Sequence, residues 1–525
     1  MARAAAFALV LALWGAGASA REAVEASAPQ SLAVTIYRDP ARGDDQAMDR
    51  DRPGGFAMIT ETREVTLPPG ESTIRFTGVA EGMVAVSAIV TGLPGGTIEK
   101  NRNADLLSPA ALVDGTLGNR VTITRTDPAT GAERREAAIV RTRADGGLVL
   151  ETSAGFEAVR CSGLPERLTF GRVPPGLSAQ PVYTIDTQGP GGTYRVELTY
   201  LAWGFDWQAH HVARVAGRGA EGDLTLGMLS WLTVLNDNGQ SFPDAELLVV
   251  AGRLNVASDY RALADPPAAR ALRLTCYPLG STAAGSPEQG FSAPSPPAPA
   301  PPMMARAESI VVTGARMADS AAPAMMAAEE QLGDLKLYRV PERVTVSARG
   351  LKQVAFLRRD AVEGKLIYEA DCAPRDGGNG PARMLFETVN DRRHGLGAAL
   401  PMGGVTVFEP DAAGDLLLAE DRLRDHAEGQ DVELWLGESA QVPVRCERVH
   451  GGDRAEGSVA MRAEINNANP RPVSLRLVLG QSADWSVRGL RETRVKDGQI
   501  VHELTIPANS RREVTWELRA ADRPG

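Results

Sequence analysis

The stretch WGFDWQAHHVARV, Trp203 to Val215, is the clearest indication of the fold, because its residues alternate in character with a period of two. In a β-strand, neighbouring side chains point to opposite faces of the sheet. The stretch therefore predicts a half-buried strand with one face against a core. The predicted inner face consists of Trp207, Ala209, His211, Ala213 and Val215. The predicted outer face consists of Gln208, His210, Val212 and Arg214.

The histidine doublet in this stretch has a structural and a chemical interpretation. On a regular strand, His210 and His211 project away from each other, so they cannot bind one metal ion together. We expect His211 to be buried and hydrogen-bonded, because buried imidazoles usually satisfy a local hydrogen bond. The chemical alternative is a cryptic hydrolase that combines Asp206 and either histidine with Asp421 and His426.

The rest of the chain consists largely of short runs with β-type alternation, separated by Gly, Pro, Asn and Asp. GPGG, Gly189 to Gly192, lies between two such runs as a hairpin turn does, and no helix-forming segment follows that would make it a phosphate-binding loop. We expect a mostly β, multidomain protein built from β-sandwich units, with an inserted small SH3-like barrel and an immunoglobulin-like C-terminal unit.

Changes in pattern and composition predict the boundaries of the segments. The predicted segments are a signal peptide at 1–20, an N-terminal β unit at 31–98, a small barrel-like unit at 103–165, a central β-sandwich part at 168–290, a Pro/Ala-rich disordered loop at 291–333 and a C-terminal β-sandwich part at 334–525.

The first residues indicate export. Arg3 precedes an apolar run that ends in Ala18-Ser19-Ala20, which is typical of a secretory signal peptide. The run is shorter than the roughly 20 residues of a membrane-spanning helix. We therefore expect a periplasmic or secreted protein with no transmembrane segment in the mature chain.

Export affects the interpretation of the four cysteines, because an oxidising compartment lets disulfides persist. Their spacing does not match a zinc site. Sequence does not fix which cysteines pair. We favour one bridge in each half of the chain, Cys161 with Cys276 and Cys372 with Cys446; the alternative is four reduced, buried thiols.

Charge and motifs exclude several classes of function. The net charge is −10, the pI is near 5.4 and the arginines are dispersed, so the sequence does not predict a basic surface patch that would bind nucleic acid. The sequence has no HExxH, GxSxG, Walker or EF-hand motif. The acid-rich segment Ala419 to Trp435 predicts a solvated surface before a strand. We therefore predict no catalytic residues, no cofactor and no metal site.

A short segment, AESIVVTGAR from Ala307 to Arg316, suggests one partner. It resembles the N-terminal peptide of TonB-dependent outer-membrane receptors, which pairs with a sheet edge of TonB. Such β-augmentation uses main-chain hydrogen bonds of a flexible, β-branched peptide. The simpler interpretation, which we favour because short motifs often match by chance, is that the segment adds an edge strand to the protein's own sheet. The candidate partner-binding residues are Glu308, Ile310, Val311, Val312 and Thr313.

Longer segments resemble a known family. They are VTIY followed by LPPGESTIRFTGV, then YLAWGFDWQAHHV, WLTVLNDNGQSFPDAELLVVAGRLN and LGAALPMGGVTVFEPDAAGDLLLAEDRL. Together they resemble the domain of unknown function 4139 family of exported bacterial proteins, whose members include mucoidy-inhibitor-A-like proteins. The resemblance implies a β-rich envelope protein and no catalytic residues. Family members often have a tyrosine where His211 stands, which favours a packing role for this side chain.

The function expected from the sequence is that of a noncatalytic cell-envelope β-scaffold or protein-binding module, which acts through sheet edges and loop tips. Its partners would be other envelope proteins. The alternatives are a TonB-interacting protein that uses residues 307–316, and the cryptic hydrolase.

Overall fold

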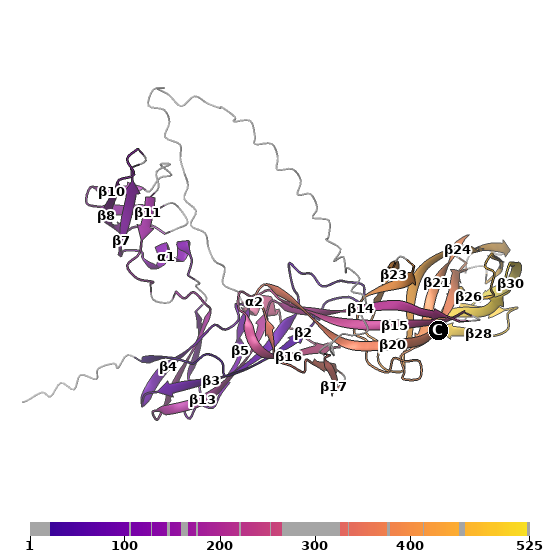
Figure 1. Cartoon of the computed structure of the whole chain (residues 1–525), viewed down its shortest axis with the longest axis horizontal. Coiled ribbons are helices and arrows are strands. Elements are labelled where there is room, and N and C mark those ends of the chain that lie inside the picture. Colours follow the sequence, from indigo (N-terminus) through magenta and orange to yellow (C-terminus); the bar gives the residue numbers. More distant parts are fainter. Residues whose placement is uncertain are drawn as a thin grey trace, which may run out of the picture. The chain divides into compact units, whose positions relative to one another are not determined.

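The computed structural model describes the larger part of the chain. The described residues are 21–103, 107–127, 129–143, 148–158, 166–174, 177–219, 222–252, 254–264, 326–333, 335–374, 379–412, 414–450 and 457–521. Figure 1 shows that almost all of the regular structure is β, as the sequence predicts. The signal peptide at 1–20, Cys161, Cys276 and the TonB-box-like segment lie outside the described residues.

The chain divides into two compact units. Among the described residues, unit 1 contains 21–32, 60–201 and 262–264, and unit 2 contains 33–59, 202–261 and 326–521. The segment boundaries predicted from the sequence are finer than this division and stay predictions.

Two sheets include the N-terminal strands. One has the order β1-β4-β12-β6, in which β1 is parallel to β4 and the other pairs are antiparallel. The other has the order β17-β18-β16-β2-β3-β13-β5, and β19 pairs with β16. The first sheet consists of β1 (Glu22–Glu25), β4 (Gly70–Thr77), β12 (Val182–Gly189) and β6 (Glu99–Asn103). The second consists of β17 (Ala328–Leu332), β18 (Leu335–Arg339), β16 (Phe242–Ala251), β2 (Ser31–Tyr37), β3 (Phe56–Leu67), β13 (Gly192–Trp203), β5 (Met83–Thr91) and β19 (Val344–Val346).

The GPGG turn joins these two sheets. β12 ends at Gly189 and β13 begins at Gly192, so the prediction of a turn is correct. However, β12 pairs with β4 and β6, whereas β13 lies between β3 and β5. The predicted hairpin is therefore wrong: the local sequence favours the turn, but packing of the sheets decides which strands pair.

A small antiparallel sheet forms a separate core within unit 1. Its order is β10-β9-β8-β7-β11, and α1 (Pro109–Gly115) contributes Ala110 and Val113 to its apolar cluster. Its strands are β7 (Arg120–Thr126), β8 (Glu133–Val140), β9 (Val149–Thr152), β10 (Gly155–Ala158) and β11 (Glu166–Thr169). Within the described residues the end strands β10 and β11 do not pair, so the predicted small SH3-like unit is an open five-stranded sheet that does not close into a barrel. Closure needs strands long enough to tilt and stagger, and here three of the five have only four residues.

Unit 2 contains a long sheet with the path β23-β22-β14-β15-β20-β21-β24-β25-β30-β27. β26 branches from β20 and continues through β29 to β28. The strands are β14 (Phe205–Arg218), β15 (Asp223–Asn236), β20 (Gly350–Asp371), β21 (Asn379–Val389), β22 (Gly403–Asp411), β23 (Gly414–Leu423), β24 (Asp431–His450), β25 (Ser458–Asn467), β26 (Val473–Gln481), β27 (Trp485–Arg488), β28 (Thr493–Lys496), β29 (Gln499–Ile506) and β30 (Ser510–Ala520). A short helix, α2 (Tyr260–Ala264), follows β16 in the chain.

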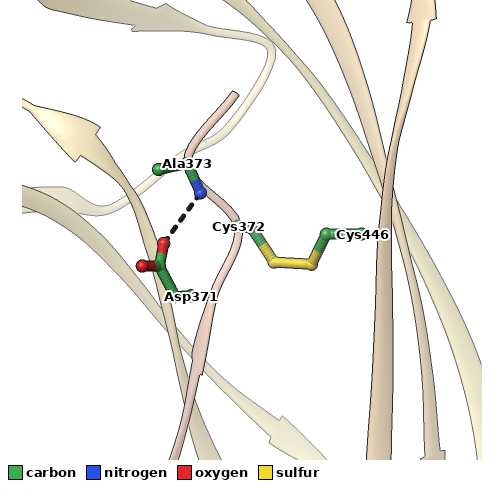
Figure 2. The surroundings of a disulfide bond; sticks show 4 residues. All are labelled: Asp371, Cys372, Ala373 and Cys446. Carbon is green, nitrogen blue, oxygen red and sulfur yellow. Dashed lines mark hydrogen bonds between the residues drawn. A yellow bond between two sulfur atoms is a disulfide. The ribbon is translucent and has the colours of Figure 1, made fainter. Parts of the chain in front are cut away.

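The C-terminal strands form a two-layered sandwich. One core cluster joins apolar side chains of β26, such as Leu475 and Leu477, to those of β25 and β30, such as Met461 and Trp516. Cys372 follows β20 and forms a disulfide with Cys446 of β24 inside this core (Figure 2), with a Cα–Cα distance of 5.4 Å. The predicted Cys372–Cys446 pairing is thus confirmed. The immunoglobulin-like topology stays a prediction.

Candidate functional site

The strand that carries the histidine doublet has the two faces predicted for it. β14 lies between β15 and β22. Its predicted inner-face residues are buried: Trp207, Ala209, His211, Ala213 and Val215. Strand alternation therefore determines the environment of each imidazole, as the sequence indicates.

His211 has a packing role. Its side chain is fully buried, with Nε2 3.0 Å from the carbonyl oxygen of Pro401 and Nδ1 2.8 Å from Oγ of Ser230. Because a carbonyl only accepts, Nε2 carries the proton and Nδ1 accepts from the Ser230 hydroxyl. Burial lowers the pKa of His211 to about 4, so the ring is neutral near pH 7. The prediction of a buried, hydrogen-bonded His211 is confirmed.

The remaining residues of the hydrolase hypothesis have separate partners. His210 Nε2 lies 3.2 Å from Oγ1 of Thr406, and Asp421 Oδ2 accepts the N–H of Trp435 at 2.7 Å. His426 Nδ1 lies 2.8 Å from the carbonyl oxygen of Arg424. In the described part of the chain, these side chains form their hydrogen bonds with other residues and not with one another, so the geometry gives the hydrolase hypothesis no support.

His426 corrects one expectation. The segment Ala419 to Trp435 was predicted to be solvated surface, but His426 is buried and its backbone pairs with that of Leu400 in both directions at 2.9 Å. Burial lowers its pKa. The neighbouring Asp425 accepts two hydrogen bonds from Arg38, at 3.0 and 2.7 Å. These contacts come from residues distant in the sequence, so local polarity does not reveal them.

Asp206 anchors a loop. Its Oδ2 pairs with the guanidinium of Arg42, and its Oδ1 accepts the N–H of Asp39 at 3.2 Å and of Trp207 at 2.8 Å. Arg42 also donates to the carbonyl oxygen of Trp207 at 2.9 Å. Desolvation raises the pKa of Asp206, and the charge of Arg42 opposes this shift. The side chain is therefore committed to holding the loop that follows β2.

A charged cluster surrounds Arg476 on β26, and sequence reasoning missed it. Nη1 lies 2.6 Å from Glu433, Nη2 lies 2.6 Å from Glu387, and Nε lies 3.1 Å from Glu503. Nη1 is also 3.3 Å from Glu369 on the adjacent strand. The one sequence signal is an arginine within the apolar run VSLRLVLG.

Lys496 of β28 completes the cluster. Its Nζ lies 3.3 Å from both Glu387 and Glu433 and 3.2 Å from Asp431. Glu387 and Glu433 are direct cross-strand partners, an arrangement that is unfavourable for like charges without nearby cations. The cluster thus joins β26 and β28 to β21 and β24, and its charges are engaged with one another.

The edge strand β23 has a different character. Among the described residues it pairs only with β22, and its Leu416 and Leu417 side chains are 53% and 59% exposed. Arg214 Nε contacts Asp415 at 2.7 Å, and Arg218 Nη2 contacts Glu409 at 2.8 Å, so β14 holds the β22–β23 hairpin. An edge strand with exposed leucines is suited to pairing with another chain.

The sequence contains a signal for this edge that was interpreted otherwise. GDLLLAEDRL is part of the family resemblance. Its three consecutive leucines followed by charged residues also indicate a strand that the rest of the protein covers incompletely. The register with β22 shifts at this point, because Phe408 faces Leu417 whereas Val407 faces Ala419. Leu418 is therefore the extra residue of a β-bulge.

Other findings bear on the predicted site types. The described parts of the chain contain no group of three His, Cys, Asp or Glu side chains arranged to hold a metal ion. No helix among the described residues has the length and apolar character needed to cross a membrane. No protein-family model matches the chain, and comparison with curated proteins finds no match. The resemblance to the exported bacterial family therefore stays a prediction.

Proposed function

We propose that the protein is a noncatalytic β-scaffold of the cell envelope that binds another protein by strand addition at the free edge of β23. The observation that supports this most is the exposure of Leu416 and Leu417 on a strand whose one sheet-pairing partner among the described strands is β22. The other end of β23, around Asp421, also contacts β24. A free edge offers a row of main-chain donors and acceptors, and pockets for alternate side chains give selectivity.

Ion pairs with β14 hold the β22–β23 hairpin in place. Arg214 and Arg218 on β14 contact Asp415 and Glu409 near the hairpin tip. These ion pairs are exposed, so each contributes little stability. Their role in the proposal is to limit the movement of the hairpin, because a preordered edge loses less entropy when a partner binds.

Charge favours a particular kind of partner strand. Acidic side chains flank the leucines on β22 and β23, at Asp411 and Glu420, whereas Glu409 and Asp415 are already paired with Arg218 and Arg214. A partner strand with apolar residues between basic ends would complement this edge. The location in the envelope rests on the signal-like first residues, and the buried disulfide between Cys372 and Cys446 supports an oxidising compartment.

Site-specific photo-crosslinking in intact cells tests the proposal. A photoreactive residue at Leu416 or at Leu417 should give the same discrete protein adduct. The matched control is Leu117, which is exposed but lies in a turn after α1 and outside a strand. Leu416→Lys, combined with the photoreactive residue at position 417, should abolish the adduct because a charge on the edge opposes strand pairing.

Thermal unfolding of Leu416→Lys should match that of the parent protein, which excludes a general loss of fold. The proposal is wrong if positions 416 and 417 give no adduct, or if Leu117 gives the same one. It is also wrong if the adduct survives Leu416→Lys.

A further inference from the structure

A pocket of about 580 Å³ in unit 2 is used neither by the β23 edge nor by the charged cluster. Its lining includes three aromatic side chains, those of Phe56, Trp203 and Tyr260. The Phe56 and Tyr260 ring centroids are 4.7 Å apart, and the Tyr37 ring stacks on the Phe56 ring with a centroid distance of 4.8 Å. The pocket is thus lined by aromatic rings, and its volume lies in the range of small-ligand sites.

The pocket lining also carries a carboxylate in a fixed position, that of Asp39. The Asp39 backbone N–H donates to the buried Asp206, and Asp39 Oδ1 accepts the N–H of Ala41 at 2.8 Å. A Cβ at Gly54 would overlap the Asp39 side chain, so the glycine lets the carboxylate lie against the backbone. The Arg42–Asp206 pair holds the same loop in place.

Trp203 is also held in place. The side-chain Nδ2 of Asn238 donates to the carbonyl oxygen of Trp203 at 3.0 Å. Asn238 itself is buried in the turn between β15 and β16. The aromatic ring and the Asp39 carboxylate therefore both extend from anchored backbone, and this preorganisation lowers the entropy lost on binding.

The charges of the pocket select the ligand class. Asp39 and Asp259 line it, and the lining residues that the structure describes include no Lys, Arg or His. Aromatic faces attract cations through the ring quadrupole, most strongly for tryptophan. We propose that this pocket binds a small organic cation that carries an alkylammonium group.

Calorimetric titration of the whole protein with choline, tetramethylammonium and spermidine tests this inference. At least one of the three should bind, and for choline the neutral isostere 3,3-dimethylbutanol should bind at least tenfold more weakly. Asp39→Asn, which keeps the shape of the side chain, should weaken binding of the cation about tenfold.

Tyr260→Leu should weaken binding by a similar factor, because it keeps apolar volume but removes the ring. The control is Trp435→Ala, which removes an exposed tryptophan that does not line the pocket and should leave binding unchanged. The inference is overturned if none of the three cations binds, if the neutral isostere binds as tightly as choline, or if Asp39→Asn has no effect.

Discussion

Two buried arginines of unit 2 differ in how their charge is balanced. The Arg42 and Asp206 side chains are 4% and 1% exposed and form a single pair, with the remaining Asp206 oxygen satisfied by backbone N–H groups. Arg476 is 1% exposed but contacts four carboxylates, whose exposure ranges from 9% to 42%. The first is a closed pair, and the second is a network that extends to solvent.

The number of ion pairs that an arginine forms is therefore a poor guide to its contribution to stability. When one partner of a closed, buried pair is removed, the other is left charged in a low-dielectric environment. In the Arg476 network, Lys496 remains as a second cation and the more exposed carboxylates can be hydrated. We therefore expect the arginine with fewer partners to matter more for stability.

The largest effect is expected for Arg42→Ala. The substitution leaves Asp206 buried without its arginine partner and should lower the free energy of unfolding by about 3–5 kcal/mol. Urea denaturation measures the loss. Combining the substitution with Asp206→Ala should cost clearly less than the sum of the two single losses. Additive losses would show that the pair is not coupled.

Arg476→Ala should cost less, about 2–3 kcal/mol, because partial exposure of the carboxylates limits the penalty for leaving them unpaired. The same denaturation experiment measures it. A second substitution, Lys496→Ala, should add more than its own single loss because no cation then separates Glu387 from Glu433. A greater loss for Arg476→Ala than for Arg42→Ala would reverse the comparison.

Lowering the pH should change the stability contributions of Glu433 and Asp206 in opposite directions. For Glu433, desolvation acts to raise the pKa, but Arg476 and Lys496 outweigh it and the net pKa is lowered. Its stabilising contribution is present above the unfolded value near 4.5 and is lost as the pH falls through the lower folded value. The pKa of Asp206 is raised, so its contribution becomes more favourable as the pH falls through that folded value.

Stability curves against pH check this prediction. The stability difference between the parent protein and Glu433→Gln should shrink below about pH 4.5. The parent protein should gain relative to Asp206→Asn when the pH falls. Parallel changes in both differences would argue against opposite pKa shifts.

The smallest effect is expected for Arg494→Ala. Arg494 contacts Glu503 at 2.6 Å at the exposed margin of the Arg476 network, and both side chains are more than a third exposed. Its loss should cost no more than about 1 kcal/mol and should decrease further in high salt. A loss of stability as large as that of Arg476→Ala would mean that the exposed Arg494–Glu503 pair contributes as much as the buried part of the network.

Parts of the candidate sites followed from local sequence, and others did not. Alternation alone placed His210 and His211 on opposite faces of β14, because every strand has this geometry. The burial of His426 was missed because it depends on Leu400 and the fold around it. The pocket was missed for a similar reason, since Phe56, Trp203 and Tyr260 belong to separate parts of the chain.

Local sequence pattern was enough to predict that the protein is mostly β and that His211 is buried. The Cys372–Cys446 pairing was a correct choice among several that the sequence left open. Three features depend on the folded chain: the small sheet is open, GPGG joins two sheets, and β23 is an edge strand with exposed leucines. The physical reason is the range of the interactions. Side-chain alternation and turn formation act over a few residues, whereas strand pairing and charge balance depend on residues that only the folded chain brings together.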